Sequence, residues 1–239
     1  MDLTICFIDD SDFEHDLVRR EIALLNPDLT FIQAYTFNEA RDLLSEKIPL
    51  LFLLDLWGFD PEVKQPELMP REELEDRISG FLTLDGVFEG LENLQTDPIN
   101  PFLKRLFTIV DSWRMLFQDV CQGAGQNRKY GLANLQSVRK FYSGIPVVFY
   151  TRKSLIHDAV AVFQAGAEGF LIKPTGDDDN ETRILTREYA PKLIEELACV
   201  IDAHINQIGI HLDSSPKETL PKSLDRQKLI SCWKEFRNK

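Results

Sequence analysis

The strongest constraint on the fold is a series of short apolar runs that are separated by segments of helical period. The runs 3–8 (LTICFI), 49–56 (PLLFLLDL), 145–150 (IPVVFY) and 169–172 (GFLI) carry almost no polar side chains before they end. Runs of this length are typical of strands buried on both faces. Residues 29–35 (LTFIQAY) add a further strand-like segment. Strands that alternate with helices favour a parallel sheet covered by helices on both faces.

The intervening segments carry the signals of helix ends. Thr36 and Ser154 stand where N-caps are expected, and Pro27 and Gly166 stand where helices should stop. The helices expected around the sheet are 12–25, 37–46, 130–144, 154–166 and 188–208.

Two parts of the chain fall outside this alternation. Residues 58–127 are far longer than an ordinary strand–helix loop, and they predict helices from Pro70, over 81–94 and over 102–122. The last of these presents a wide apolar stripe, which must be covered either by its own neighbours or by a partner. Residues 209–239 read as a linker and then a short helix from Ser223, which either packs on the body or docks a partner.

Composition excludes several classes of protein. The 239 residues carry a net charge of −12, which argues against a general nucleic-acid binder. The four cysteines are far apart, which argues against a disulfide framework or a zinc site. We see no signal peptide, and no apolar run approaches the ~20 residues of a membrane span. We therefore expect a cytoplasmic protein without membrane or nucleic-acid partners.

Polar residues with related chemistry follow the predicted strands. Asp9 and Asp10 follow the first strand, Asp55 the third, Thr151 the fourth and Lys173 the fifth. In doubly wound sheets, ligands bind at the carboxyl ends of the strands. Three carboxylates attract a hard cation such as Mg²⁺, while an ammonium and a hydroxyl can hold an oxyanion. The set suits phosphoryl transfer to an aspartate.

Four fragments of the sequence resemble the CheY-like receiver domains of bacterial two-component response regulators. They are FIDD (7–10), LFLLD (51–55), IPVVFYT (145–151) and AGAEGFLIKP (165–174). The resemblance implies an α/β, flavodoxin-like, doubly wound (βα)5 parallel sheet with strand order 2-1-3-4-5. It implies a discontinuous receiver domain in 1–57 and 128–208, a helical insertion in 58–127 between the third strand and the third helix, and a linker with a C-terminal helix in 209–239.

The resemblance also implies a metal site and a phosphoacceptor. Asp55 would accept the phosphoryl group. Asp10 would ligate Mg²⁺ directly, and Asp9 would help through water. Asp55 and the backbone carbonyl of Trp57, two residues further on, would complete the protein's ligands.

Three further positions carry implied roles. Thr151 and Lys173 would contact phosphoryl oxygens, and Phe170 would be the aromatic side chain that reorients on phosphorylation. Arg152 stands where the family usually has a small residue. It could gate the site, pair with the phosphoryl group, pair with an acid of the insertion, or lie in solvent.

The resulting hypothesis is a response regulator that is not an enzyme in the ordinary sense. It would take a phosphoryl group from a histidine kinase or phosphotransfer protein and signal through an output protein, in part through 58–127, or as a homodimer. The alternative is a pseudo-receiver that binds partners without phosphorylation. A phosphatase of the haloacid-dehalogenase type is disfavoured because Trp57 stands where that family needs a second aspartate, and a P-loop enzyme because its glycine-rich motif is absent.

Overall fold

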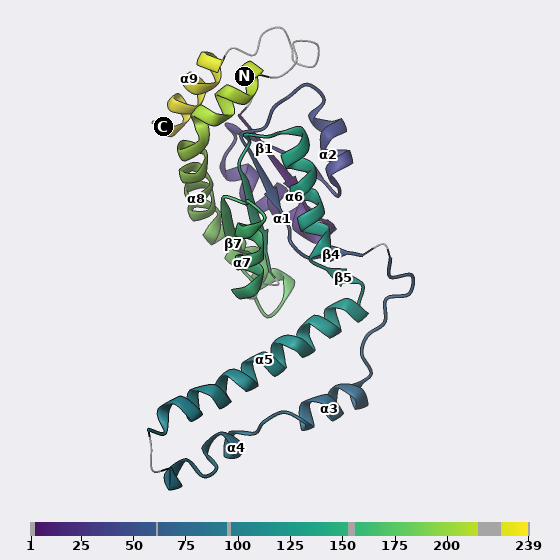
Figure 1. Cartoon of the computed structure of the whole chain (residues 1–239). Coiled ribbons are helices and arrows are strands. Elements are labelled where there is room, and N and C mark those ends of the chain that lie inside the picture. Colours follow the sequence, from purple (N-terminus) through teal and green to yellow (C-terminus); the bar gives the residue numbers. More distant parts are fainter. Residues whose placement is uncertain (1–2, 61, 95–96, 153–155, 215–225, 239) are drawn as a thin grey trace. The chain divides into compact units, whose positions relative to one another are not determined.

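The computed structural model describes residues 3–60, 62–94, 97–152, 156–214 and 226–238. The chain divides into two compact units. The first consists of Met1–Gly58 and Arg128–Lys239, and the second, which we call the insertion unit, of Phe59–Asn127. Figure 1 shows the sheet within the first unit and a long helix within the second.

The first unit is built on a parallel sheet of five strands: β1 (Leu3–Ile8), β2 (Leu29–Ala34), β3 (Leu51–Leu54), β6 (Val147–Thr151) and β7 (Gly169–Ile172). Their order is β2-β1-β3-β6-β7, and each neighbouring pair is parallel. Counted along the chain, these five strands have the order 2-1-3-4-5, so the predicted flavodoxin-like topology is confirmed.

The register brings the strand ends together at one edge of the sheet. Ile8, the last residue of β1, pairs with Ala34 of β2 and with Leu54 of β3. Leu54 in turn pairs with Phe149 of β6. The polar residues that follow β1, β3, β6 and β7 therefore share the carboxyl edge.

Burial explains why three of these strands consist almost entirely of apolar residues. Every residue of β1, β3 and β6 is buried, because helices cover both faces of the sheet. The edge strand β7 is only partly buried, since it has one neighbouring strand.

Helices surround this sheet (Figure 1). They are α1 (Asp12–Leu17), which continues as a π-helical turn (Val18–Ile22) and a 3₁₀ turn (Ala23–Leu25), α2 (Phe37–Leu44), α6 (Lys129–Phe141), α7 (Ile156–Gln164), α8 (Asp179–Ser214) and α9 (Arg226–Arg237). The predicted N-cap Thr36 accepts a hydrogen bond from the Glu39 amide. The predicted N-cap Ser154 and helix start Ser223 lie outside the described residues.

Among the helices around the sheet, the first and the last differ most from their predictions. The first is not one α-helix over 12–25 but an α-helix that widens into a π-turn. The last of these helices, α8, starts at Asp179 instead of near residue 188. The Asp178 carboxylate caps this helix by accepting a hydrogen bond from the Glu181 amide. The helix runs through Pro191, which the predicted range 188–208 already contained, and it ends at Ser214 instead of residue 208.

The insertion unit is helical. Its elements are α3 (Arg71–Ser79), α4 (Leu84–Phe88), the 3₁₀ turn Leu91–Asn93 and α5 (Ile99–Gly123), and the short strands β4 (Gly58–Phe59) and β5 (Gln126–Asn127) pair with each other where the chain enters and leaves. The predicted helix over 81–94 is too long, since Gly90 has a φ of +69° and the chain turns there. Among the helices described, none is long and apolar enough to cross a membrane.

Candidate functional site

Three carboxylates converge at the carboxyl edge of the sheet. Asp9 and Asp10 directly follow β1, and the Asp55 amide donates to the Ile8 carbonyl at 2.9 Å, which holds the end of β3 beside β1. One oxygen each of Asp9, Asp10 and Asp55 lies within 4.8 Å of the others. Asp9 and Asp55 are buried, whereas Asp10 is partly exposed. This geometry suits a divalent cation with several retained waters.

Lys173 brings a positive charge to the same point. Its amide donates to the Thr151 carbonyl at 3.0 Å, which places it beside the end of β6. Its Nζ lies 2.5 Å from an oxygen of Asp9, 3.3 Å from one of Asp55 and 3.4 Å from one of Glu14. The side chain is 3% exposed, so these carboxylates replace nearly all of the water around the ammonium.

The electrostatics of the site follow from burial and from these neighbours. Burial and the nearby Asp9 raise the pKa of Asp55 to about 7, although Lys173 and Thr151 act in the opposite direction. Burial alone would lower the pKa of Lys173, but the carboxylates of Asp55, Asp9 and Glu14 outweigh it and raise that pKa. Lys173 therefore stays charged, and the negative charge of the carboxylates around it exceeds its single positive charge.

Thr151 supplies a hydroxyl that is available to a ligand. Its side chain is buried, and among the described residues its Oγ1 makes no hydrogen bond of normal geometry. It nevertheless lies close enough to Asp55 to lower the pKa of that carboxyl. Because an unsatisfied buried hydroxyl is unfavourable, the position fits a donor to an oxyanion held at Asp55. The residues present thus fit both Mg²⁺ and a phosphoryl group.

Two predicted positions remain predictions in their roles. Trp57, two residues after Asp55, has a buried side chain, whereas the predicted metal ligand is its backbone carbonyl. Phe170 lies in β7, paired in register with Phe149, and is partly exposed. Phe170 therefore lies on the strand that neighbours the one ending at Thr151.

Sequence reasoning missed Glu14 as a part of this site. It lies in the first turn of α1, where its amide is capped by Ser11 Oγ at 3.4 Å. Its carboxylate is buried and contacts both Lys173 and Arg152. A carboxylate three residues after an N-cap is normally taken as a capping-box residue, so the pattern gave no reason to place it in the site.

Tyr130 was also missed, and it lines the acid cluster from the first turn of α6. Its hydroxyl donates to the Tyr35 carbonyl at 2.6 Å. Burial raises the pKa of Tyr130, and the negative charges around Asp55 raise it further. Gly58 leaves room for the ring, since a Cβ there would lie 2.5 Å from it. The chain that returns from the insertion unit therefore borders the site.

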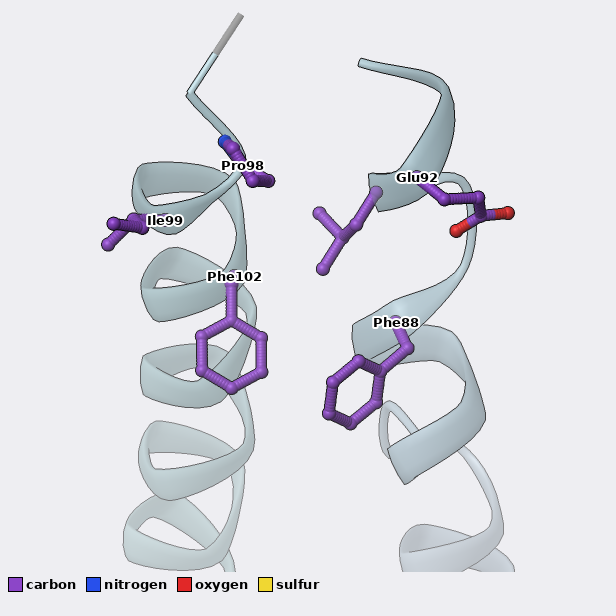
Figure 2. Close-up of a pocket in the computed structure, with 6 residues that line it drawn as sticks. Phe88, Glu92, Pro98, Ile99 and Phe102 are labelled. Carbon is purple, nitrogen blue, oxygen red and sulfur yellow. The ribbon is translucent and has the colours of Figure 1, made fainter.

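The insertion unit contains a separate apolar hollow of about 370 Å³. Figure 2 shows the rings of Phe88 and Phe102 side by side on its wall, with centroids 5.3 Å apart. The remaining lining residues are Leu91, Glu92, Pro98 and Ile99. It holds none of the predicted site residues.

Structures similar to this one are receiver domains of response regulators. The CheY-like receiver domain protein from Methanospirillum hungatei JF-1 is 14% identical over 84% of this chain and 98% of that chain, with a TM-score of 0.41. The response regulator domain of Thermotoga maritima CheB is 15% identical over 84% of this chain and 98% of that chain, with a TM-score of 0.44. The Mn²⁺-bound form of response regulator Rcp1 is 15% identical over 78% of this chain and 91% of that chain, with a TM-score of 0.38.

No protein-family model matches the sequence, and no curated protein is significantly similar to it. The fold is assigned from strand order and register.

Proposed function

We propose that this chain is a phosphoacceptor receiver of a two-component system. It takes a phosphoryl group on Asp55 from a histidine kinase or phosphotransfer protein in the presence of Mg²⁺, and it signals by binding other proteins. The observation that carries this proposal is the convergence of Asp9, Asp10 and Asp55 beside Lys173, whose Nζ lies 3.3 Å from Asp55.

The chemistry needs one nucleophile and a means of balancing charge. An Asp55 oxygen attacks phosphorus, a new P–O bond forms, and the bond to the donor breaks with its electron pair leaving on the donor. Asp10, Asp55 and the Trp57 carbonyl would hold Mg²⁺ directly and Asp9 would help through water, and the ion would neutralise charge on the phosphoryl oxygens.

The chain's own residues do the remaining work. Lys173 and the free Thr151 hydroxyl hold phosphoryl oxygens, and burial excludes water from Asp55. The chain acts in its own phosphorylation and hydrolysis, and it turns over no metabolite. Phe170, at the edge strand β7, would transmit the change.

The direct test is the intact mass of the protein after incubation with acetyl phosphate and Mg²⁺. We expect one added phosphoryl group that is absent without Mg²⁺ and absent in Asp55→Asn. Asp60→Asn is the matched control, because Asp60 is another buried acid, hydrogen bonded to Asn127 within the insertion unit. An adduct on Asp55→Asn, or none on the folded wild type, would overturn the proposal.

One observation favours the pseudo-receiver as the second candidate. Asp55 is buried, and in the absence of metal its pKa is raised to about 7, so part of the metal-free population is protonated at neutral pH and is a poor nucleophile. If acetyl phosphate gives no adduct, a beryllium fluoride soak distinguishes the cases. Bound beryllium fluoride at Asp55 would show an open pocket, and its absence would favour a chain that binds partners constitutively.

We further propose that the insertion unit is the output module. Its helix α5 exposes a row of large apolar side chains, made up of Ile99, Leu103, Phe107, Val110, Trp113 and Phe117. They recur at helical spacing, so they lie along one stripe that fits an apolar partner surface.

The structure offers a clean deletion to test the output role. The Asp60 amide donates to the Gly125 carbonyl at 2.8 Å, so residues 61–124 can be replaced by a short glycine link. We expect the shortened chain to be phosphorylated like the wild type and to lose binding of its output protein. Loss of folding on deletion, or retained binding, would contradict the proposal.

A further inference from the structure

The ammonium of Lys173 has one carboxylate partner that the proposed chemistry does not use. Two of its partners, Asp9 and Asp55, belong to the acid cluster. The third is Glu14, whose Oε2 lies 3.4 Å from Nζ and whose side chain is 8% exposed. A buried carboxylate this close to the ammonium competes with Asp55 for it, because the three acids share one cation.

Arg152 meets the other oxygen of the same carboxylate. Its Nε donates to Glu14 Oε1 at 2.6 Å, so Arg152 and Lys173 bind Glu14 from two sides. Its Nη1 donates to the Pro174 carbonyl at 2.7 Å and to Thr175 Oγ1 at 3.0 Å. The guanidinium is therefore held beside Glu14 by fixed partners from the segment that follows Lys173.

The two contacts on Glu14 are unequal. The Arg152 contact is charge-assisted and of hydrogen-bond length, while the Lys173 contact is longer than a normal hydrogen bond. Arg152 thus satisfies most of the Glu14 charge. In its absence, Glu14 would be a buried carboxylate with Lys173 as its remaining cation among the contacts described above, and it would bind that ammonium more tightly.

We propose that Glu14 and Arg152 act as one unit that sets how strongly Lys173 is available to Asp55. Both are positioning residues: Glu14 acts on the ammonium, and Arg152 acts through Glu14. This inference rests on the proposed function, and it gives the arginine that follows Thr151 a role through its contact with Glu14.

The test is a rescue experiment on the rate of phosphorylation by acetyl phosphate with Mg²⁺. Arg152→Gln should lower the maximal rate about three- to tenfold, because Glu14 then withdraws Lys173. Glu14→Gln should raise it, since Lys173 is no longer shared. The double variant Glu14→Gln/Arg152→Gln should return to a rate near that of the wild type.

The rescue separates positioning from a merely structural role. If Arg152 served only to tie Pro174 and Thr175 in place, removal of the Glu14 charge could not restore the rate. A double variant as slow as Arg152→Gln would therefore overturn the proposal. Arg152→Lys, which keeps the charge, should lose less than Arg152→Gln.

A matched control is available in Arg183. Its guanidinium lies over the same Phe13 ring as that of Arg152, at 5.2 Å against 5.7 Å, but it pairs with Asp16. Arg183→Gln should leave the rate within about twofold of the wild type. An effect as large as that of Arg152→Gln would show that the rate responds to any charge on this side of α1, and would contradict the proposal.

A second readout does not depend on phosphorylation. Lys173 is the buried lysine among the described residues, so its ammonium should give a slowly exchanging ¹⁵N–¹H signal. We expect Arg152→Gln to shift this signal and the double variant to restore it. If the wild type takes no phosphoryl group, the proposed function fails, while this signal still decides whether Glu14 and Arg152 act together. If the Lys173 signal did not shift in Arg152→Gln, the inference would be refuted.

Discussion

Gly131 lies against the backbone of Asp55 so closely that a Cβ on it would be 2.5 Å from the Asp55 carbonyl oxygen. The Gly131 amide also donates to the Leu56 carbonyl at 3.1 Å. The first turn of α6 is therefore docked on the residues that follow β3. The chain that leaves after Leu56 for the insertion unit returns through this contact.

Gly131→Ala should lower the free energy of unfolding by about 1–3 kcal/mol, because the added methyl meets backbone atoms that cannot rotate away. Urea denaturation measures the loss. Gly80→Ala is the control, since a Cβ there has one ordinary contact, at 3.5 Å from the Arg77 carbonyl oxygen. Equal stability of Gly131→Ala and wild type would show that α6 is not docked as described.

The sheet and its polar edge could be predicted from the sequence because both depend on local patterns. Each buried strand is a short apolar run, and parallel strands place their ends together, so Asp9, Asp55 and Lys173 had to share an edge once the strands were recognised. Thr36 was recognised as a cap because its side-chain chemistry acts within one turn.

The rest depended on contacts between distant parts of the chain. Glu14 and Arg152 are 138 residues apart in the sequence, and no local pattern in either segment predicts that they pair. Tyr130 reaches the site because Gly58 makes room for its ring, which only the folded chain reveals. The helix over 81–94 was predicted too long because its apolar stripe continues past Gly90, where the backbone adopts a positive φ.

Without metal, Asp55 should make stability depend on pH in a defined direction. Its pKa is about 7 in the folded protein and about 4 when unfolded, so the folded form binds the proton more tightly. The stability this confers is present below pH ~4 and is lost as the pH rises towards ~7. Urea unfolding from pH 5 to 8 should show the decline.

Asp55→Asn isolates this contribution, because it removes the titrating group and keeps the shape. At pH 8 the variant should be more stable than the wild type by about 1–4 kcal/mol, and the difference should shrink towards pH 5. A difference that does not vary with pH would mean that Asp55 titrates normally. The sign would be reversed if Lys173 lowered the pKa of Asp55 below its usual value.

Mg²⁺ binding should depend on Asp10 even though this acid is the most exposed of the three. Asp10→Asn should weaken Mg²⁺ binding at least about tenfold, the loss seen even for outer-shell partners of a metal. Isothermal titration calorimetry on unphosphorylated protein measures it directly. Asp16→Asn is the control, since Asp16 lies on α1 and pairs with Arg20 and Arg183. Equal affinity for Asp10→Asn and wild type would remove Asp10 from the metal site.

The C-terminal helix α9 should contribute to the stability of the first unit through Trp233. This side chain is 2% exposed, and its Nε1 donates to Asp202 of α8 at 2.6 Å. Trp233→Ala should cost about 3 kcal/mol, because it removes a large buried ring and leaves a cavity.

Trp113→Ala provides the comparison for Trp233→Ala. Trp113 lies on α5 of the insertion unit and is 49% exposed, so its loss should cost well under half as much. Urea unfolding followed by far-ultraviolet circular dichroism measures both variants without relying on tryptophan emission. If Trp233→Ala were as mild as Trp113→Ala, α9 would not be docked on α8 in solution, and its apolar side would be free to bind a partner.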